Sequence, residues 1–143
     1  MVIEVKVNNI TAKALVDQQT TGASLISSTY ASTHNLPTIP FHDGVDVNLA
    51  LQGSKGRSTH YVTVNLDIGG HIEPVTFCVA ALADWDIILG EPLLRILKAN
   101  IDVAKRTMTI TPTSSRQPIH INNITSRTRR TTPMVSIAQI TLT

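Results

Sequence analysis

Cysteine and aromatic residues are scarce in this sequence of 143 residues. It contains a single cysteine, Cys78, and aromatic side chains make up only 3% of its residues. One cysteine excludes a disulfide within the chain and a cysteine-rich metal site, and such sparing use is typical of a reducing compartment. We therefore expect Cys78 to be a thiol of the core and the protein to be intracellular, in the cytoplasm.

A long apolar segment is also lacking. No hydrophobic run approaches the roughly 18–20 residues that a membrane-spanning helix needs. The first residues, Met-Val-Ile-Glu-Val-Lys, do not show the charged and then apolar pattern of a secretory signal. The sequence therefore predicts a soluble chain without a membrane partner.

Grouped metal ligands and a phosphate-binding loop are missing as well. The five histidines are scattered without the spacing of a zinc site. Residues 52–56, Gln-Gly-Ser-Lys-Gly, superficially resemble a phosphate loop, but they lack its Gly-Lys-Ser/Thr ending and no helix is predicted after them. We expect neither a metal ion nor another cofactor.

Acidic residues are absent from the C-terminal segment. Through Ile110 the chain has eight Lys and Arg residues and ten acids, whereas residues 111–143 hold four arginines and no acid. A chain of this length forms one domain with its own core but not two. We expect a single domain over residues 1–110 and a basic, largely disordered tail or linker over residues 111–143. Nucleic acid is an unlikely partner, except for weak phosphate contacts through the tail arginines.

Strand signals fill most of the sequence. The hydrophobic fraction of 42% comes mainly from Val, Ile, Leu and Ala, and the alternation of apolar and polar residues favours strands. Consecutive hairpins are predicted over residues 2–16, 45–68, 58–81 and 101–110, with turns at Asn8-Asn9 and Gly69-Gly70 and a loop over residues 38–44. Short helices are predicted from Ser27 or Ser28 to about His34 and from Glu91 to Lys98. This order of elements indicates an all-β, antiparallel architecture.

One acid lies between two apolar runs. Leu15-Val16 precede Asp17 and Leu25-Ile26 follow it, and the residues between them form a polar loop. Because a buried carboxylate without partners is costly, Asp17 either caps its own loop or takes part in chemistry. The residues of this stretch alone leave both alternatives open.

A second stretch, residues 86–90, has an acid, three apolar residues and a glycine, Asp-Ile-Ile-Leu-Gly. A proline-containing helix is predicted directly after it. Asp84 and Asp86 flank Trp85 in this region, and either acid is a conceivable second carboxylate for chemistry with Asp17. Turn chemistry favours the other interpretation, in which Asp86 stabilises the turn before the strand.

The two stretches together resemble the protease segment of gypsy-type long-terminal-repeat retrotransposon polyproteins, a group of retropepsin-like aspartic proteases. The matching residues are Ala-Leu-Val-Asp at 14–17, Leu-Ile-Ser at 25–27 and Asp-Ile-Ile-Leu-Gly-Glu-Pro-Leu-Leu at 86–94. The resemblance covers roughly residues 2–110. It implies a single-lobe closed barrel of antiparallel hairpins with one or two short helices. It also implies that the catalytic loop is supported by Ile87, Ile88, Leu89 and Gly90.

The same resemblance implies an aspartic endopeptidase in which Asp17 is the catalytic acid. Because such chemistry needs two carboxylates and the chain supplies one, a homodimer would pair Asp17 with Asp17 of a second copy. The paired acids would activate a water molecule against a carbonyl of an extended peptide or polyprotein substrate. The hairpin tip would be the flap that closes over the substrate, comprising Gln52, Gly53, Ser54, Lys55 and Gly56.

The loop after Asp17 departs from the family pattern, in which Ser or Thr and then Gly follow the acid. Gln18 and Gln19 occupy these positions, so a hydroxyl and a glycine are missing. One hypothesis is that Thr20 or Thr21, followed by Gly22, supplies both from a shifted position. The alternative is a retropepsin-fold binding or dimerisation module with impaired catalysis.

Overall fold

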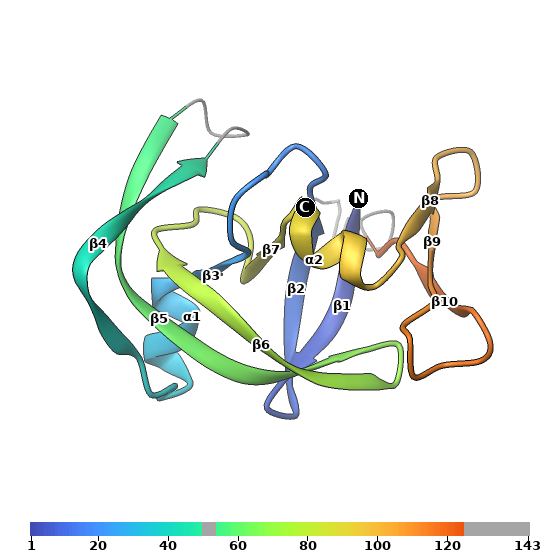
Figure 1. Ribbon diagram of the computed structural model, residues 1–143, viewed down its shortest axis with the longest axis horizontal. Helices are drawn as coiled ribbons and strands as arrows, with labels where there is room; N and C mark the ends of the chain where they lie inside the picture. Colours follow the sequence, from blue (N-terminus) through green and yellow to red (C-terminus); the bar gives the residue numbers. More distant parts are fainter. Residues whose placement is uncertain (50–53, 125–143) are drawn as a thin grey trace, which may run out of the picture.

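The computed structural model describes residues 1–49 and 54–124, and strands make up most of them (Figure 1). The elements in chain order are β1 (Val2–Val7), β2 (Ile10–Val16), β3 (Leu25–Ser27), α1 (Ser28–Thr33), β4 (Ile39–Leu49), β5 (Ser54–Ile68), β6 (His71–Ala80), β7 (Ile87–Leu89), α2 (Glu91–Ile96), β8 (Asn100–Asp102), β9 (Thr107–Ile110) and β10 (Ile119–Asn122). The all-β class with short helices is thereby confirmed. No helix in these two ranges is long and apolar enough to cross a membrane.

Six strands close into a barrel. The larger sheet has the order β1-β2-β7-β3-β6-β5-β4, and β1 also pairs with β5, so the ring closes and leaves β4 outside it. The predicted hairpin turns are present: Asn8 and Asn9 both have positive φ between β1 and β2, and Gly69 and Gly70 do so between β5 and β6. Positive φ at both central residues suits the right-handed twist of the strands that a two-residue turn joins.

Two pairings in the barrel are parallel, which the hairpin pattern did not predict. Strand β7 pairs in parallel with β2, and β3 pairs in parallel with β6. These partners lie far apart in the sequence, and their pairing follows from closing the barrel over its core, not from a turn. Strand β7 also pairs with β3, so it lies between the strands that enter and leave the loop after Asp17.

The predicted loop over residues 38–44 is partly strand. Ile39 and Pro40 pair with Tyr61 and His60, and a bulge separates them from the pairs that begin at Val45. Glycine and proline suggested a loop to sequence analysis because both are rare in regular strands, but both are common at bulges. The β4–β5 hairpin is therefore longer than predicted and projects from the barrel (Figure 1).

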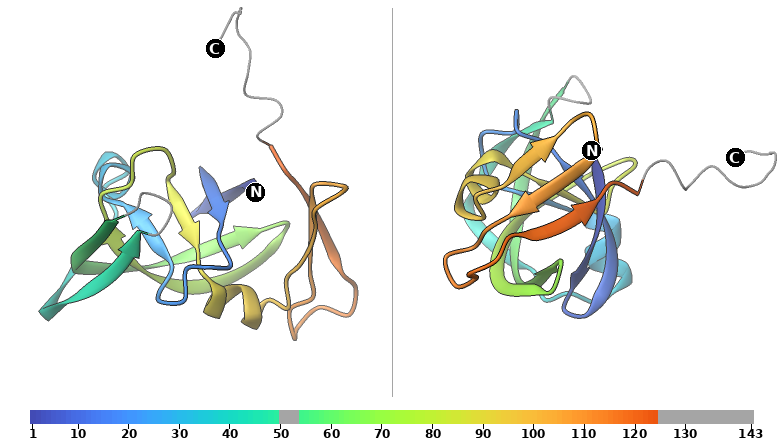
Figure 2. Two further views of the ribbon diagram at one scale, coloured as in Figure 1. Left: turned by 90° about the horizontal axis from the view of Figure 1, so that it is seen from above. Right: turned by 90° about the vertical axis from the view of Figure 1, so that its right-hand side faces the viewer.

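The expectation of a largely disordered tail over residues 111–143 is wrong for residues 119–122, which form a strand. Strand β10 pairs with β9, which also pairs with β8, and the three lie side by side at one end of the molecule (Figure 2, right). Ile121 is buried, and the Ile124 amide donates to the Val2 carbonyl at 2.9 Å. The sequence does alternate apolar and polar residues at Ile119 and Ile121, but this alternation is too short to have predicted a strand by itself. Arg127, Arg129 and Arg130 lie outside the described residues.

The core has two clusters of buried side chains. The larger fills the barrel, and Phe77 and Leu97 are among its fully buried members. The smaller includes Leu15, Ile88 and Cys78. Cys78 is a free, buried thiol as predicted, and burial raises its pKa while a hydrogen bond with Ser58 opposes the increase. The elements on either side of Asp17 therefore rest on packed apolar side chains.

Candidate active site

Asp17 lies directly after β2 and is only 8% exposed. Its backbone amide donates to the Leu89 carbonyl at 3.0 Å, which extends the parallel pairing of β2 with β7 by one residue. Asp17 is thus positioned by β2, which precedes it, and by β7, which accepts its amide hydrogen.

Both oxygens of the Asp17 carboxylate accept hydrogen bonds from the loop that follows. The backbone amide of Gln19 donates to Oδ1 at 2.9 Å, and the Thr20 hydroxyl donates to Oδ2 at 2.8 Å. Asp17 therefore caps its own loop, which was one of the two sequence-based alternatives. An ionised carboxylate can accept about four hydrogen bonds, so these two leave capacity for a water molecule or a second acid.

Strand β7 and the start of α2 hold the loop from the other side. The Glu91 amide donates to the Thr20 carbonyl at 2.7 Å, and the Gly90 amide donates to Ser24 Oγ at 2.9 Å. A Cβ on Gly90 would lie 3.0 Å from the carbonyl oxygens of Thr20 and Gly22, which is tighter than an ordinary contact, so the close approach favours glycine. Ser24 was missed by sequence analysis; a small polar residue at the start of a buried strand was its only signal.

The residues of the loop after Asp17 differ in their exposure to solvent. Thr20 is buried, whereas Thr21 and Gly22 are exposed, so the hydroxyl that reaches Asp17 belongs to Thr20. Gln18 and Gln19 are exposed and line a cavity of about 360 Å³. The other lining residues are Met1, Val16, Ile101, Asp102, Val103, Arg106 and Asn123.

Asp86 has a structural role, but through bonds to β2 and Ser27 and not through the turn before its strand. Its Oδ2 accepts from the Lys13 amide at 2.8 Å, and its backbone bonds to Ser27 and Lys13. Burial and then the Asp86 carboxylate raise the pKa of Tyr30 to about 12. Asp86 therefore ties β2 to the start of α1, while Asp84 is exposed.

Only part of the predicted flap lies among the residues that the structure describes. Ser54, Lys55 and Gly56 begin β5 and pair with the end of β4, whereas Gln52 and Gly53 lie outside the described residues. Arg57 donates to Asp46 Oδ1 at 3.1 Å and also to the Asp43 carbonyl in the bulge. Figure 1 shows the end of β4, the start of β5 and the segment after β2 on the same, upper side of the molecule.

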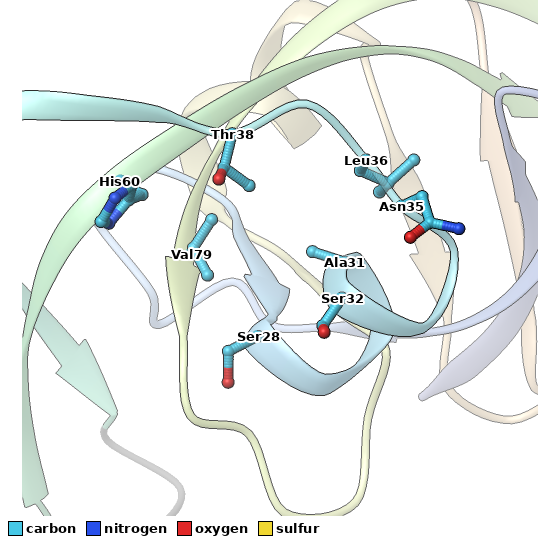
Figure 3. Close-up of a pocket in the computed structure, with 8 residues that line it drawn as sticks. All are labelled: Ser28, Ala31, Ser32, Asn35, Leu36, Thr38, His60 and Val79. Carbon is cyan, nitrogen blue, oxygen red and sulfur yellow. The ribbon is translucent and has the colours of Figure 1, made fainter.

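A separate pocket of about 500 Å³ lies between α1 and strands β5 and β6 (Figure 3). It is lined by Ser28, Ala31, Ser32, Asn35, Leu36, Thr38, His60 and Val79, none of which carries a carboxylate. Within residues 1–49 and 54–124, His, Cys, Asp and Glu side chains nowhere gather in a group that could hold a metal ion. The buried acid with its loop partners is therefore the candidate site.

A closed six-stranded barrel with a buried acid in the loop after β2 has the retropepsin-like protease fold. The retroviral protease-like domain of Ddi1 from Leishmania major is similar, with a TM-score of 0.58 and 16% identity over 85% of this chain and 88% of that chain. The EIAV protease complexed with the inhibitor HBY-793 has a TM-score of 0.55 and 16% identity over 72% of this chain and 92% of that chain.

Sequence comparison then gives the family. The model of the PEG10/RTL1 protease domain matches residues 13–119, so the chain belongs to this family. The match includes the Asp17 loop, β7 and α2, and it ends at the first residue of β10. A comparison with curated proteins found no match.

Proposed function

We propose that the chain acts as an aspartic endopeptidase in a homodimer, with Asp17 of each copy as the catalytic acid. The observation that carries this proposal is the buried Asp17 in a protease-domain fold: its backbone amide donates to Leu89, and its carboxylate accepts from Gln19 and Thr20. One such acid per chain is half of a site that needs two.

The chemistry follows from pairing two carboxylates. Two acids close together cannot both be ionised at low cost, so one is the general base and the other keeps its proton. The base takes a proton from water as the water attacks the peptide carbonyl, and the acid protonates the carbonyl oxygen. The same pair then transfers a proton to the leaving amine.

The proposed dimer face lies beside the loop. The glutamine-lined cavity is bordered by Val103, which is 84% exposed, and by β8, an edge strand of the smaller sheet. A second copy seated here would cover this apolar side chain and bring its own Asp17 loop close to the first. Burial of exposed apolar surface is the main favourable contribution to such association.

The proposed substrate is an extended peptide within a polyprotein of a gypsy-type retroelement, processed inside the cell. The β4–β5 hairpin would lie over the peptide, and exposed strand edges would pair with its backbone. Apolar side chains of the smaller core cluster, such as Leu15 and Ile88, would border the pockets for substrate side chains.

Cleavage of a peptide mixture at acidic to mildly acidic pH tests the proposal. The wild-type chain should cleave, a pepstatin-type inhibitor should stop cleavage, and Asp17→Asn should abolish it. Activity that survives Asp17→Asn would show that another group performs the reaction.

A second candidate function is a binding or dimerisation module without catalysis. It is favoured by one observation: Gln18 and Gln19 stand where the family has a hydroxyl residue and a glycine. A chain that dimerises and binds peptides but never cleaves them would support this function. The double change Gln18→Ser with Gln19→Gly separates the two cases, since restored cleavage from an inert parent identifies the loop as the cause.

A further inference from the structure

The three-stranded sheet β8-β9-β10 has two different faces. The residues that face the barrel are apolar, and Met108, Ile110 and Ile121 among them belong to its buried core. The alternate residues form the outer face, and all six are polar: Asn100, Asp102, Thr107, Thr109, His120 and Asn122. Strand pairing places the six in two rows across the sheet, one centred on Thr109 and the other on Thr107. The sheet forms one end of the molecule (Figure 2, right).

Positive charge is concentrated in this part of the chain. Residues 1–94 hold four Lys and Arg side chains and nine Asp and Glu, whereas residues 95–124 hold five basic side chains and one acid. The five basic side chains are exposed: Arg95, Lys98, Lys105, Arg106 and Arg116. Arg95 pairs with Glu91, but the other four form no ion pair with any residue that the structure describes. The barrel is therefore net negative, and the small sheet carries unpaired positive charge.

The four unpaired cations lie at the two ends of the outer face. Lys98 comes just before β8. The loop that holds Arg116 begins beside it, because the Thr111 amide donates to the Leu97 carbonyl at 2.9 Å. The other two cations lie in the turn between β8 and β9, at the opposite end. Since β9 has four residues of about 3.3 Å each, about 13 Å separates the two ends. Phosphates of one nucleic-acid strand are about 3.4 Å apart along a helix axis, so this length accommodates about four of them.

Two of these cations occupy backbone positions that favour other residue types. Five non-glycine residues in the described ranges have positive φ, and three of them are asparagines, which tolerate the left-handed region. The other two are Lys98, with φ of 52°, and Arg106, with φ of 55°. The left-handed conformation is unfavourable for long side chains of this kind, and such strain is kept mostly where a residue has a function. The strain therefore favours a role for these two cations beyond that of a solvated surface.

The groups between the two ends fit a single strand of RNA. Amide, hydroxyl and imidazole groups can exchange hydrogen bonds with the 2′-hydroxyl groups of ribose, which DNA lacks. The two helices among the described residues, α1 and α2, have six residues each, too few to read the major groove of a duplex. The one acid on the face, Asp102, accepts a bond at 3.0 Å from the backbone amide of Lys105. One acid and four cations leave the face net positive.

We propose that the outer face of the β8-β9-β10 sheet binds single-stranded RNA through its phosphates and ribose hydroxyl groups. This function goes beyond the proposed cleavage of peptides, and the sequence alone suggested phosphate contacts only in the tail. The face is distinct from the β8 edge and the glutamine-lined cavity of the proposed dimer. Arg106 also lines that cavity, so the tests use the other three cations.

The test measures fluorescence anisotropy of a fluorescein-labelled RNA strand of about 12 nucleotides, a length within the site sizes of single-strand-binding folds. All variants keep the whole tail, so its arginines contribute equally. Each phosphate contact with a single strand adds about 0.7 to the slope of log affinity against log salt, which is about fivefold in affinity at 0.1 M salt. The triple change Lys98→Gly, Lys105→Ala and Arg116→Ala should therefore lower affinity about 100-fold and reduce the slope by about 2. Lys6→Ala, which removes an exposed cation of β1, is the matched control and should change neither.

Lys98→Gly alone separates the loss of a contact from the loss of the fold. Glycine relieves the strain of positive φ, so Tm should not fall, while RNA affinity should fall about fivefold. Lys98→Arg keeps the charge and should keep wild-type affinity. A DNA strand of the same sequence should bind more weakly than RNA, because it lacks the 2′-hydroxyl groups.

Three results would overturn the proposal: wild-type affinity and slope in the folded triple variant, equal affinity for DNA and RNA, or preference for phosphatidylserine vesicles over RNA. The outcome is independent of the proposed protease activity. Asp17→Asn should bind RNA as wild type does, and the triple variant should cleave peptides as wild type does.

Discussion

Replacing Gly90 by alanine should destabilise the protein through the loop that holds Asp17. The new Cβ would lie 3.0 Å from the carbonyl oxygens of Thr20 and Gly22, whereas ordinary contacts begin at 3.4 Å. The Thr20 carbonyl cannot easily retreat, because it accepts a hydrogen bond from Glu91. Overpacking of this kind costs about 1–3 kcal/mol. At about 4 °C per kcal/mol for a domain of this size, Tm should fall by about 4–12 °C.

Gly22→Ala is the matched control, since a Cβ on Gly22 would meet nothing within 4 Å and its φ is not in the left-handed region. Its Tm should stay within about 2 °C of wild type, as for most exposed substitutions. The assay is thermal unfolding followed by circular dichroism at one protein concentration, because self-association would make Tm depend on concentration. Equal Tm values for the two variants would refute the packing described here for the loop against β7.

Two further predictions concern the rest of the fold. A chain that ends after residue 110 should be less stable than one that ends after residue 124, because it lacks β10, the buried Ile121 and the bond from Ile124 to Val2; equal urea midpoints would contradict this. The folded state raises the pKa of Tyr30 from 10.0 to about 12, so it holds the phenol proton more tightly than the unfolded chain does. This contribution to the free energy of unfolding is fully present below about pH 10 and is lost as the pH rises towards about 12. Tyr30→Phe should flatten the pH dependence of stability in that window, and an unchanged slope in urea titrations would show that another group causes it.

Local signals allowed much of the fold to be predicted. Two asparagines in succession and two glycines in succession mark tight turns, because both residue types tolerate positive φ. Ser27 or Ser28 was predicted to start α1, and it is the Ser27 side chain that accepts a hydrogen bond from the backbone amide of Tyr30. Each of these features depends on residues that are neighbours in the sequence.

Pairings between strands that lie far apart in the sequence could not be predicted from local residue patterns. Nothing in the residues of β2 specifies that β7 pairs with it in parallel, and the closure of β1 on β5 involves only two residue pairs. Such contacts are selected by the burial of many side chains at once. The sequence pattern records only which face of each strand is apolar.

In the candidate site, too, some features could be predicted from the local sequence and others could not. A lone acid between two apolar runs indicated that Asp17 either caps its own loop or takes part in chemistry, and the structure shows the loop contacts of the first alternative. Which hydroxyl reaches the acid could not be predicted, because Thr20 and Thr21 are adjacent residues of one type and differ only in the direction of their side chains. The path of the backbone against Gly90 buries Thr20 and leaves Thr21 exposed.

The proposal that two Asp17 carboxylates share one site is tested most directly by mixing chains. Increasing amounts of Asp17→Asn chain are added to a fixed amount of wild type, and the initial rate of peptide cleavage is measured at mildly acidic pH. The proposal predicts that the rate falls as mixed dimers form, because each mixed dimer holds a single acid. A rate that stays constant while exchange between chains is demonstrated, or cleavage by the Asp17→Asn chain alone, would contradict it.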